Sequence, residues 1–259
     1  MRRTIRRTLP KNVAGYLARK QSEVNSGKDP RKAWDKARKT KTLQIVAEIL
    51  VKMCAGRRRC MFCDDSRGTE IDHYWPIVPY RQKTFLWDNM LWVCGGCNRA
   101  KGNRFDLDPQ GAPLLIDPTA EDPWDFLFFE PDTGIITARI VGESGSPHPK
   151  GQYTADCGVL PLNIEAVTEG RRRTYRSLCR AVRRFLTRAL EDTDRSTIPE
   201  DVIEEIRDHD DYGLANWYFL KDGQDMPPFS ELRQKHRSVW LAITTALGTH
   251  PEASHALNP

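Results

Sequence analysis

Two Cys-x-x-Cys pairs, separated by thirty residues, constrain this chain more than any other feature of its sequence. Each pair forms a tight knuckle that directs two thiolates toward one point. Two knuckles complete a tetrahedral shell of soft ligands, which selects zinc over magnesium or calcium. Because four cysteines leave no open coordination position, we expect a structural zinc ion. The expected ligands are Cys60, Cys63, Cys94 and Cys97.

The remaining three of the seven cysteines, Cys54, Cys157 and Cys179, lack this spacing, and we expect them to be small buried groups. Metal-binding pairs, in place of a disulfide set, are typical of a reducing compartment. The sequence has no run of about 20 apolar residues and no apolar segment before a cleavage site. We therefore expect a cytoplasmic protein without a membrane span or a signal peptide.

Charge is distributed unevenly along the 259 residues, although the net charge is only +5. Basic residues predominate from Met1 to Lys41, and acidic residues predominate from Glu191 to Asp225. A basic end on a nearly neutral chain is typical of contact with phosphates, or of a solvated and partly disordered arm. Apolar residues make up 39% of the chain, which is enough to bury a core.

Hydrophobic periodicity predicts an α+β fold that is mostly helical, with a small zinc-braced centre. Asp29-Pro30 is a helix start, because an Asp N-cap precedes Pro at the first helical position. Two apolar runs, 126–129 and 135–140, flank a Gly-bearing turn and predict a β-hairpin. The expected regions are a basic helical region (1–55), the cysteine region (56–108), and the hairpin with C-terminal helices that pack on it (109–259).

The C-terminal region contains three expected helices. The longest is amphipathic and covers about Ile164 to Leu190, the second begins near Pro199, and the last covers Phe229 to Leu247. The polar face of the longest helix is rich in arginine, and we expect it to contact nucleic acid. The residues we select for this role are Arg173, Arg176 and Arg180. The same face is also compatible with docking of an acidic partner, or with simple solvation.

A carboxylate, an imidazole and two amides lie between the cysteine pairs or directly after the second pair. Asp72 and His73 end a short β-prone run, and Asn89 precedes a second apolar run. Asn98 follows the last cysteine, where a short helix is expected to begin. The predicted order is therefore strand, loop, strand, helix. Adjacent side chains of a strand point to opposite faces, so a bend is required for Asp72 and His73 to serve one site.

This arrangement resembles the HNH endonuclease superfamily, in the variant whose ββα-metal fold is braced by a four-cysteine zinc site. The resemblance implies that His73 is the general base that activates water, and that the Asn89 amide orients it. It implies that Asp72 is a ligand of the catalytic metal. Asn98 stands where many members have a second metal-binding histidine, and this is a departure from the common pattern.

Elementary chemistry agrees with these roles. A neutral imidazole can take a proton from water, and one divalent ion can stabilise the leaving oxygen of a phosphodiester. Asp72 and Asn98 offer hard oxygen ligands, which suit Mg²⁺ or Mn²⁺. Lys101 and Arg104 follow closely, and we expect them to hold the phosphate.

Shorter strings extend the resemblance toward one group of nucleases. These strings include Cys97-Asn98-x-x-Lys101-Gly102-Asn103, the segment 115–118, and Leu160-x-Leu162-Asn163 before the arginine-rich helix. They are similar to the HNH nuclease subunit of Septu-type anti-phage defence systems and related retron-associated nucleases. That resemblance implies a partner ATPase. The chain has no phosphate-binding loop of the form GxxxxGK[ST], so ATP would be used by another chain.

Two other functions are compatible with the sequence. The first is a stand-alone restriction or homing-type HNH nuclease, with the same chemistry in a different role. The second is a catalytically inactive zinc-ribbon adaptor that only binds nucleic acid. The presence of both His73 and Asn89 argues against an adaptor, since a binding module needs neither. We expect DNA as the substrate, although the sequence by itself does not distinguish DNA from RNA.

Overall fold

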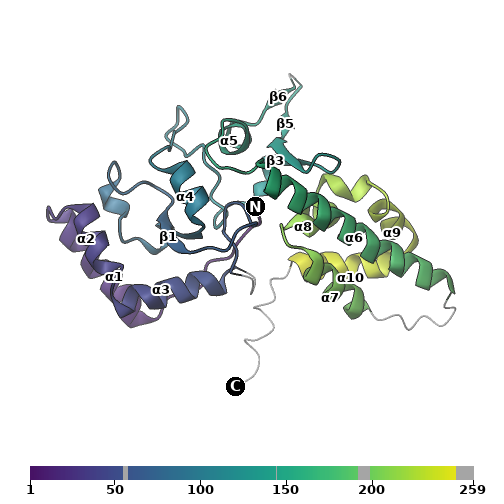
Figure 1. The fold of residues 1–259 in the computed structure, drawn as a ribbon, viewed down its shortest axis with the longest axis horizontal. Coiled ribbons are helices and arrows are strands. Elements are labelled where there is room, and N and C mark those ends of the chain that lie inside the picture. Colours follow the sequence, from purple (N-terminus) through teal and green to yellow (C-terminus); the bar gives the residue numbers. More distant parts are fainter. Residues whose placement is uncertain (55–57, 144, 192–198, 249–259) are drawn as a thin grey trace. The chain divides into compact units, whose positions relative to one another are not determined.

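The structure is a computed structural model, which describes residues 1–54, 58–143, 145–191 and 199–248 (Figure 1). The chain forms two compact units. The first consists of Met1, Arg3–Phe128 and Ile136–Leu162, and the second of Arg2, Phe129–Ile135 and Asn163–Pro259. Apart from Arg2, the expected regions 1–55 and 56–108 therefore lie together in the first unit, and 109–259 is divided between the two.

The predicted fold class is confirmed, since the fold is α+β and 53% helical. Within the described ranges, every sheet has two strands. None of the helices in the described part of the chain is long and apolar enough to cross a membrane.

Three helices begin the first unit: α1 (Lys11–Asn25), α2 (Pro30–Ala37) and α3 (Lys41–Lys52). The predicted start of α2 is confirmed, because the Asp29 carboxylate accepts a hydrogen bond from the Lys32 amide at 2.7 Å. Thr40 caps α3 in the same way. Buried apolar residues on α1 and α3, including Val13, Leu17, Leu43 and Leu50, form part of the core.

For the basic segment from Met1 to Lys41, the sequence also allowed a partly disordered arm, and this alternative is wrong. The Arg6 guanidinium donates hydrogen bonds to the carbonyl oxygens of Trp87, Asp88 and Met90 at 2.8–2.9 Å. It also lies over the Trp87 ring, 5.1 Å from the centroid. This basic side chain therefore fixes the backbone that leads into the second strand.

The predicted order of strand, loop, strand and helix is confirmed by β1 (Glu70–His73), β2 (Met90–Val93) and α4 (Gly95–Lys101). The two strands pair antiparallel, with Asp72 opposite Leu91 and His73 opposite Met90. The connection contains two short 3-10 turns, η1 (Arg81–Lys83) and η2 (Trp87–Asn89).

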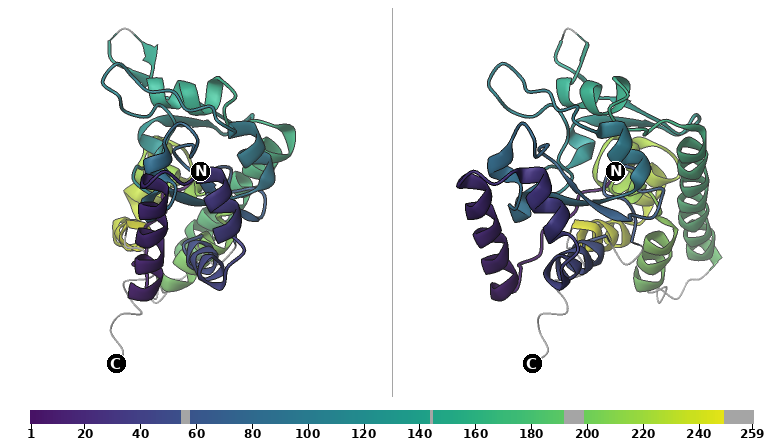
Figure 2. Two further views of the ribbon diagram at one scale, coloured as in Figure 1. Left: turned by 90° about the vertical axis from the view of Figure 1, so that its left-hand side faces the viewer. Right: turned by 60° about the vertical axis from the view of Figure 1, so that its left-hand side comes forward.

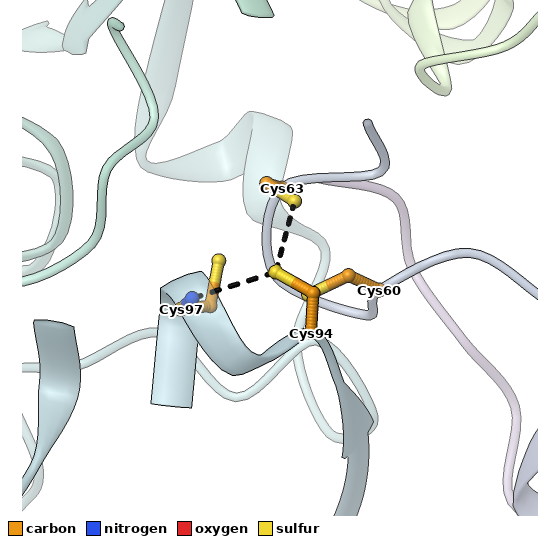
Figure 3. A group of neighbouring side chains, drawn as sticks. All are labelled: Cys60, Cys63, Cys94 and Cys97. Carbon is orange, nitrogen blue, oxygen red and sulfur yellow. Dashed lines mark hydrogen bonds between the residues drawn. The ribbon is translucent and has the colours of Figure 1, made fainter. Parts of the chain in front are cut away.

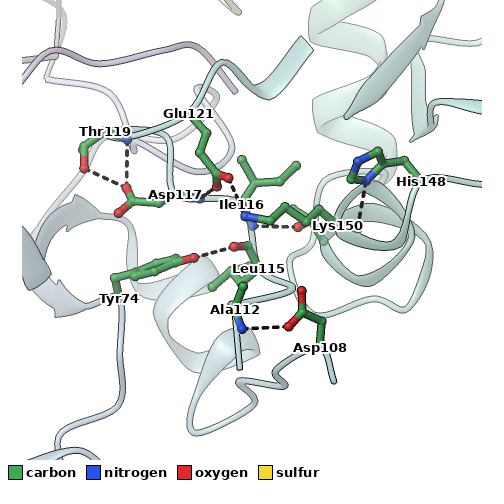
Figure 4. A network of polar contacts seen from close by, with 11 residues as sticks. Tyr74, Asp108, Ala112, Leu115, Ile116, Asp117, Thr119, Glu121, His148 and Lys150 are labelled. Carbon is green, nitrogen blue, oxygen red and sulfur yellow. Dashed lines mark hydrogen bonds and ion pairs between the residues drawn. The ribbon is translucent and has the colours of Figure 1, made fainter. Parts of the chain in front are cut away.

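The rest of the first unit is a long, mostly irregular passage that polar contacts hold in place (Figure 4). The Tyr74 hydroxyl donates to the Leu115 carbonyl oxygen, and the Asp117 carboxylate accepts from the amide and hydroxyl of Thr119. Lys150 forms an ion pair with Glu121. The residue after His73 is thereby anchored. Residues 129–135, in β3, β4 and their turn, belong to the second unit. The elements between Asn103 and Leu162 are η3 (Pro123–Asp125), β3 (Leu127–Glu130), β4 (Ile135–Ala138), β5 (Ile140–Val141), β6 (Ser146–Pro147), α5 (Pro149–Gly151) and η4 (Gln152–Asp156).

The second unit is helical around an aromatic core. Tyr218 stacks on Phe229 at 4.3 Å and on Tyr175 at 5.3 Å between ring centroids. The predicted last helix is two helices that meet at His236, and α8 was not predicted. The helical elements are α6 (Glu165–Glu191), α7 (Pro199–His209), α8 (Leu214–Leu220), η5 (Asp222–Asp225), α9 (Phe229–Lys235) and α10 (Arg237–Gly248).

The predicted hairpin is confirmed by β3 and β4, and its turn depends on Gly134. Gly134 has φ +76°, and a Cβ atom there would overlap the Thr168 carbonyl oxygen of α6. Arg171, which is fully buried, donates to the Gly134 carbonyl oxygen at 2.8 Å. Only glycine therefore fits this approach of turn and helix.

A left-handed alanine by itself costs about 1–2 kcal/mol. We predict that Gly134→Ala lowers the free energy of unfolding by more than this, because the new Cβ atom also overlaps the Thr168 carbonyl oxygen. Gly158→Ala is the matched control, since Gly158 has φ +64° and open space around its Cβ position. Thermal unfolding followed by circular dichroism measures both. Equal losses in the two variants would contradict the packing argument.

Candidate functional site

The four paired cysteines come together in one buried cluster, called the cysteine cluster below (Figure 3). Their sulfur atoms lie within 4.8 Å of one another, and the Sγ atoms of Cys63 and Cys94 are 3.9 Å apart. A tetrahedral zinc site with Zn–S bonds of about 2.3 Å places its sulfurs about 3.8 Å apart. In the described part of the chain, no other group of three or more His, Cys, Asp or Glu ligands is this close.

Local backbone contacts build both knuckles. In the first knuckle, the Asp64 amide donates to the Cys60 carbonyl oxygen at 3.0 Å, and the Met61 amide donates to the Trp92 carbonyl oxygen of β2 at 2.9 Å. In the second, Cys94 caps α4, and its sulfur accepts from the Cys97 amide at 3.4 Å. The cluster thus joins the segment before β1 to the end of β2 and the start of α4.

The chemistry of the cluster also fits a bound cation. Burial raises the pKa of the Cys60 thiol. Hydrogen bonds, of which the one from Cys60 contributes most, lower the pKa of Cys94. Ionisation of all four buried thiols therefore requires a compensating positive charge. A soft divalent ion such as zinc supplies that charge, so the predicted structural zinc site is supported by geometry and by electrostatics.

His73 is buried, and its ring orientation is fixed by one hydrogen bond. Its Nε2 lies 2.9 Å from the Thr84 carbonyl oxygen. Since a carbonyl only accepts, Nε2 carries the hydrogen and Nδ1 is the basic atom of the neutral ring. The Trp34 ring of α2 packs edge-on against the imidazole at 4.3 Å between centroids. This burial lowers the pKa of His73 to about 3, so the ring is neutral at pH 7.

The Asn89 amide contacts the backbone of the loop and not the imidazole. Its Oδ1 accepts from the Trp75 amide at 2.7 Å, and its Nδ2 donates to the carbonyl oxygens of Trp75 and Lys83 at 3.0 and 2.9 Å. Lys83 immediately precedes Thr84, which holds the ring of His73. Asn89 therefore positions His73 through the loop, in place of the direct contact that the resemblance implies.

Gln21 of α1 supports the same loop, and the sequence analysis missed it. Its Oε1 accepts from the Phe85 amide at 2.7 Å, and its Nε2 donates to the Arg81 carbonyl oxygen at 3.2 Å. Gln21 is a buried polar residue on a helix whose other buried residues are apolar. Without the fold, nothing marks it as a contact of residues 81–85.

Lys101 is placed differently from the expectation. Its ammonium is buried, lies 3.1 Å from Asp72 Oδ2 and donates to the His73 carbonyl oxygen at 2.6 Å. Burial raises the pKa of Asp72, and the charge of Lys101 opposes that rise. Lys101 thus ties α4 to β1 and is withdrawn from solvent, so we no longer assign it a phosphate contact.

Arg104 is also occupied by the chain itself. Although exposed, its guanidinium donates to the carbonyl oxygens of Ala100 and Val159, at 3.0 and 3.2 Å. We therefore no longer assign Arg104 a phosphate contact either.

Asp72, His73 and Asn98 line one hollow of about 240 Å³ in the first unit. The loop contacts described above hold the end of β1 so that both neighbouring side chains reach this hollow. Asp72 and Asn98 contribute a carboxylate and an amide side chain to the lining, and His73 contributes its imidazole. These donors suit a hard divalent ion beside a general base.

Four further charged residues line the hollow and were missed by the sequence analysis: Glu70, Arg31, Asp35 and Arg38. Glu70 precedes Asp72 by two positions in β1, so both side chains lie on the same face of the strand. Arg31 and Arg38 flank Trp34 on α2 at spacings of three and four, which places all three on one helical face. The helical spacing is visible in the sequence, but its position over the hollow is not.

The selected arginines of α6 lie in the second unit and are exposed. Arg173 lies 3.6 Å from Glu169 in an ion pair. Arg180 donates to the Arg176 carbonyl oxygen at 3.2 Å and lines a separate hollow, whose lining includes neither Arg173 nor Arg176.

Comparisons with protein-family profiles, with curated proteins and with solved structures find no match for this chain. The HNH resemblance therefore rests on the sequence motifs alone.

We predict that the purified chain holds about one zinc ion, and that Cys94→Ser removes it and destabilises the first unit. Structural zinc contributes on the order of 10 kcal/mol of apparent binding free energy, so the effect is large. Cys157 is the matched control, because it is exposed and not buried as expected from the sequence. Cys157→Ser is expected to retain the metal. Elemental analysis and urea unfolding measure both. An unchanged zinc content in Cys94→Ser would contradict the site.

We predict a pH dependence of stability that originates in His73. The unfolded imidazole gains a proton below about pH 6.5, whereas the folded one, with its pKa lowered to about 3, does not. Its contribution to folding is therefore fully present above pH 6.5. It falls by up to about 1.4 kcal/mol for each pH unit below that value.

Urea unfolding of the wild type and of His73→Gln, both zinc-loaded, measures this contribution between pH 7.5 and pH 5. Because both chains keep the cysteine cluster, loss of zinc at low pH affects them equally. The gap between their stabilities is expected to change by about 2 kcal/mol over this interval. Parallel pH profiles would show that His73 is not buried as described.

Proposed function

We propose that this chain is a metal-dependent endonuclease of the HNH type, which hydrolyses phosphodiester bonds in nucleic acid, with DNA as the expected substrate. One observation carries the proposal. A carboxylate (Asp72), a neutral imidazole (His73) and an amide (Asn98) line one hollow on a strand–strand–helix unit that the cysteine cluster braces.

In the proposed mechanism, His73 accepts a proton from water at Nδ1, while its bond to Thr84 keeps the ring in the required tautomer. An imidazole of low pKa is unprotonated at pH 7 and can therefore accept a proton, but it is a weak base. The attacking water must therefore be acidified by its surroundings. Mg²⁺ or Mn²⁺, if held by Asp72 and Asn98, would supply this acidification and would neutralise charge on the phosphate.

Asp72 and Asn98 are the residues that would hold this ion through oxygen atoms. An ionised carboxylate has about four acceptor positions, and Lys101 takes one of them, so ligand positions remain. The positive charge of the Lys101 ammonium also repels a divalent ion at this position. We therefore expect millimolar rather than micromolar affinity for Mg²⁺.

We propose that Arg31 and Arg38 contact the phosphate, in place of Lys101 and Arg104. Both arginines are exposed on the face of α2 that lines the hollow, and a guanidinium binds a phosphate through two parallel hydrogen bonds. Arg38 shares its charge with Asp35, 3.2 Å away. Arg31 has no acidic partner within 4 Å among the residues that the structure describes, so we give it the larger share of phosphate binding.

The biological role is a second layer of the proposal. The resemblance to Septu-type nuclease subunits favours an anti-phage effector that works with an ATPase partner, and a stand-alone nuclease is the alternative. A catalytically inactive adaptor is favoured by one contact, the Lys101–Asp72 ion pair, since it already neutralises the carboxylate. Activity measurements separate an enzyme from an adaptor.

We predict that the chain cleaves supercoiled plasmid in the presence of Mg²⁺ or Mn²⁺, and that His73→Ala lowers the rate about 100- to 10,000-fold. Asn89→Ala is expected to cost less, because it loosens the loop without removing the base. Asp72→Ala is expected to lose activity that high Mn²⁺ partly restores. His148→Ala is the matched control, because His148 does not line the hollow.

The comparison requires equal zinc content in all variants, which elemental analysis provides. Parallel reactions with single-stranded RNA show whether DNA is the preferred substrate. If the zinc-loaded wild type and His73→Ala cleave at the same rate, or if neither cleaves, the nuclease assignment is wrong and the adaptor takes its place.

A further inference from the structure

The second unit carries a basic hollow that the proposed nuclease chemistry does not use. It has a volume of about 830 Å³ and is lined by residues of α6 and α7. These two helices pack against each other, and their ribbons lie side by side in Figure 2. The opposite face of α6 is apolar and buried through Leu178, Val182 and Phe185. Four arginines at spacings of three, one and four residues line the hollow, and we call them the arginine row: Arg180, Arg183, Arg184 and Arg188.

The charge of this hollow is unbalanced. Glu205 of α7 forms an ion pair with Arg184 and also lies 3.9 Å from His209 Nε2. Arg183 and Arg188 have no acidic partner within 4 Å among the residues that the structure describes. Four guanidinium groups therefore share one carboxylate, and their mutual repulsion is relieved when an anion binds.

The rest of the lining indicates which kind of anion fits. Besides the arginine row, the hollow is lined by two hydroxyl side chains, Ser177 and Thr187, and by His209. Among the residues that the structure describes, no Val, Ile, Leu, Met, Phe, Tyr or Trp lines it. Protein interfaces bury an apolar or aromatic centre, whereas contacts to a nucleic-acid backbone are polar and rich in arginine.

The length of the row agrees with a nucleic-acid backbone. Eight residues of helix separate Arg180 from Arg188, which corresponds to about 12 Å. Each strand of a duplex rises about 3.4 Å along the duplex axis for each phosphate, so a row parallel to that axis spans about three phosphate steps. Every basic residue of α6 is arginine, whose planar fork binds phosphate through two hydrogen bonds.

We propose that the arginine row is a second nucleic-acid contact, which binds the phosphate backbone without reading the sequence. It goes beyond the proposed function, because it concerns binding by the second unit and needs neither His73 nor a divalent ion. It also narrows the expectation from sequence. Arg180 belongs to the contact, whereas Arg173 and Arg176, on the same helix, do not line it.

The test is binding of a fluorescein-labelled 20-base-pair duplex, followed by anisotropy in EDTA from 50 to 250 mM NaCl. The groove variant is Arg183→Gln/Arg188→Gln. It is expected to bind at least 10-fold more weakly at 100 mM salt, and the slope of log K against log salt is expected to fall by about two. The control is Arg173→Gln/Arg176→Gln, which removes the same charge from the same helix and is expected to bind like the wild type.

Two results would overturn the proposal. One is equal loss in the groove variant and the control, which would indicate a general charge effect. The other is wild-type duplex binding by the groove variant together with lost binding of labelled poly-glutamate, which would indicate a docking face for an acidic protein. Thermal unfolding checks that both variants fold.

Failure of the nuclease proposal is distinguishable from failure of this one. A wild type that binds the duplex through the arginine row but cleaves nothing would contradict only the nuclease assignment. A wild type that cleaves, with unchanged binding in the groove variant, would contradict only the arginine row.

Discussion

The cysteine cluster is the constraint on which the candidate site depends. β1 and β2 have four residues each, and a two-stranded sheet of that size is marginal by itself. The cluster closes the sheet at one end, because its first knuckle bonds to Trp92 of β2 and its second begins α4. Lys101, at the end of α4, then reaches back to Asp72 and to the His73 backbone. Asp72, His73 and Asn98 share a hollow as a consequence.

His73 shows how much of the fold is needed to hold one side chain. Thr84 fixes its tautomer, Asn89 and Gln21 fix the loop that carries Thr84, and Trp34 removes the ring from water. These contacts come from α1, α2, η2 and the loop between the strands. The N-terminal helices are therefore part of the site rather than an appended arm, and the basic character of the first ten residues serves partly to hold the backbone near Trp87.

The sequence predicted what is local and missed what depends on packing. Cys-x-x-Cys spacing, the order strand–loop–strand–helix, the Asp29 cap and the turn at Gly134 each follow from a short pattern, and the structure agrees. Lys101 was misplaced because a lysine near a short helix's end is usually exposed, and only the approach of α4 to β1 buries it. α8 was missed because Leu214–Leu220 is a short apolar run without periodicity. The position of Arg31 over the hollow depends on tertiary contacts.

We propose that the hollow around Asp72 binds a divalent ion and a phosphate on a zinc-braced frame. The most direct measurement is anomalous diffraction from crystals of the zinc-loaded His73→Ala chain grown with Mn²⁺ and a short DNA duplex. The account predicts a zinc peak among the four sulfurs and a manganese peak about 2.1 Å from an Asp72 carboxylate oxygen, with a phosphate beside it. Manganese bound elsewhere, with Asp72 still paired only to Lys101, would contradict it.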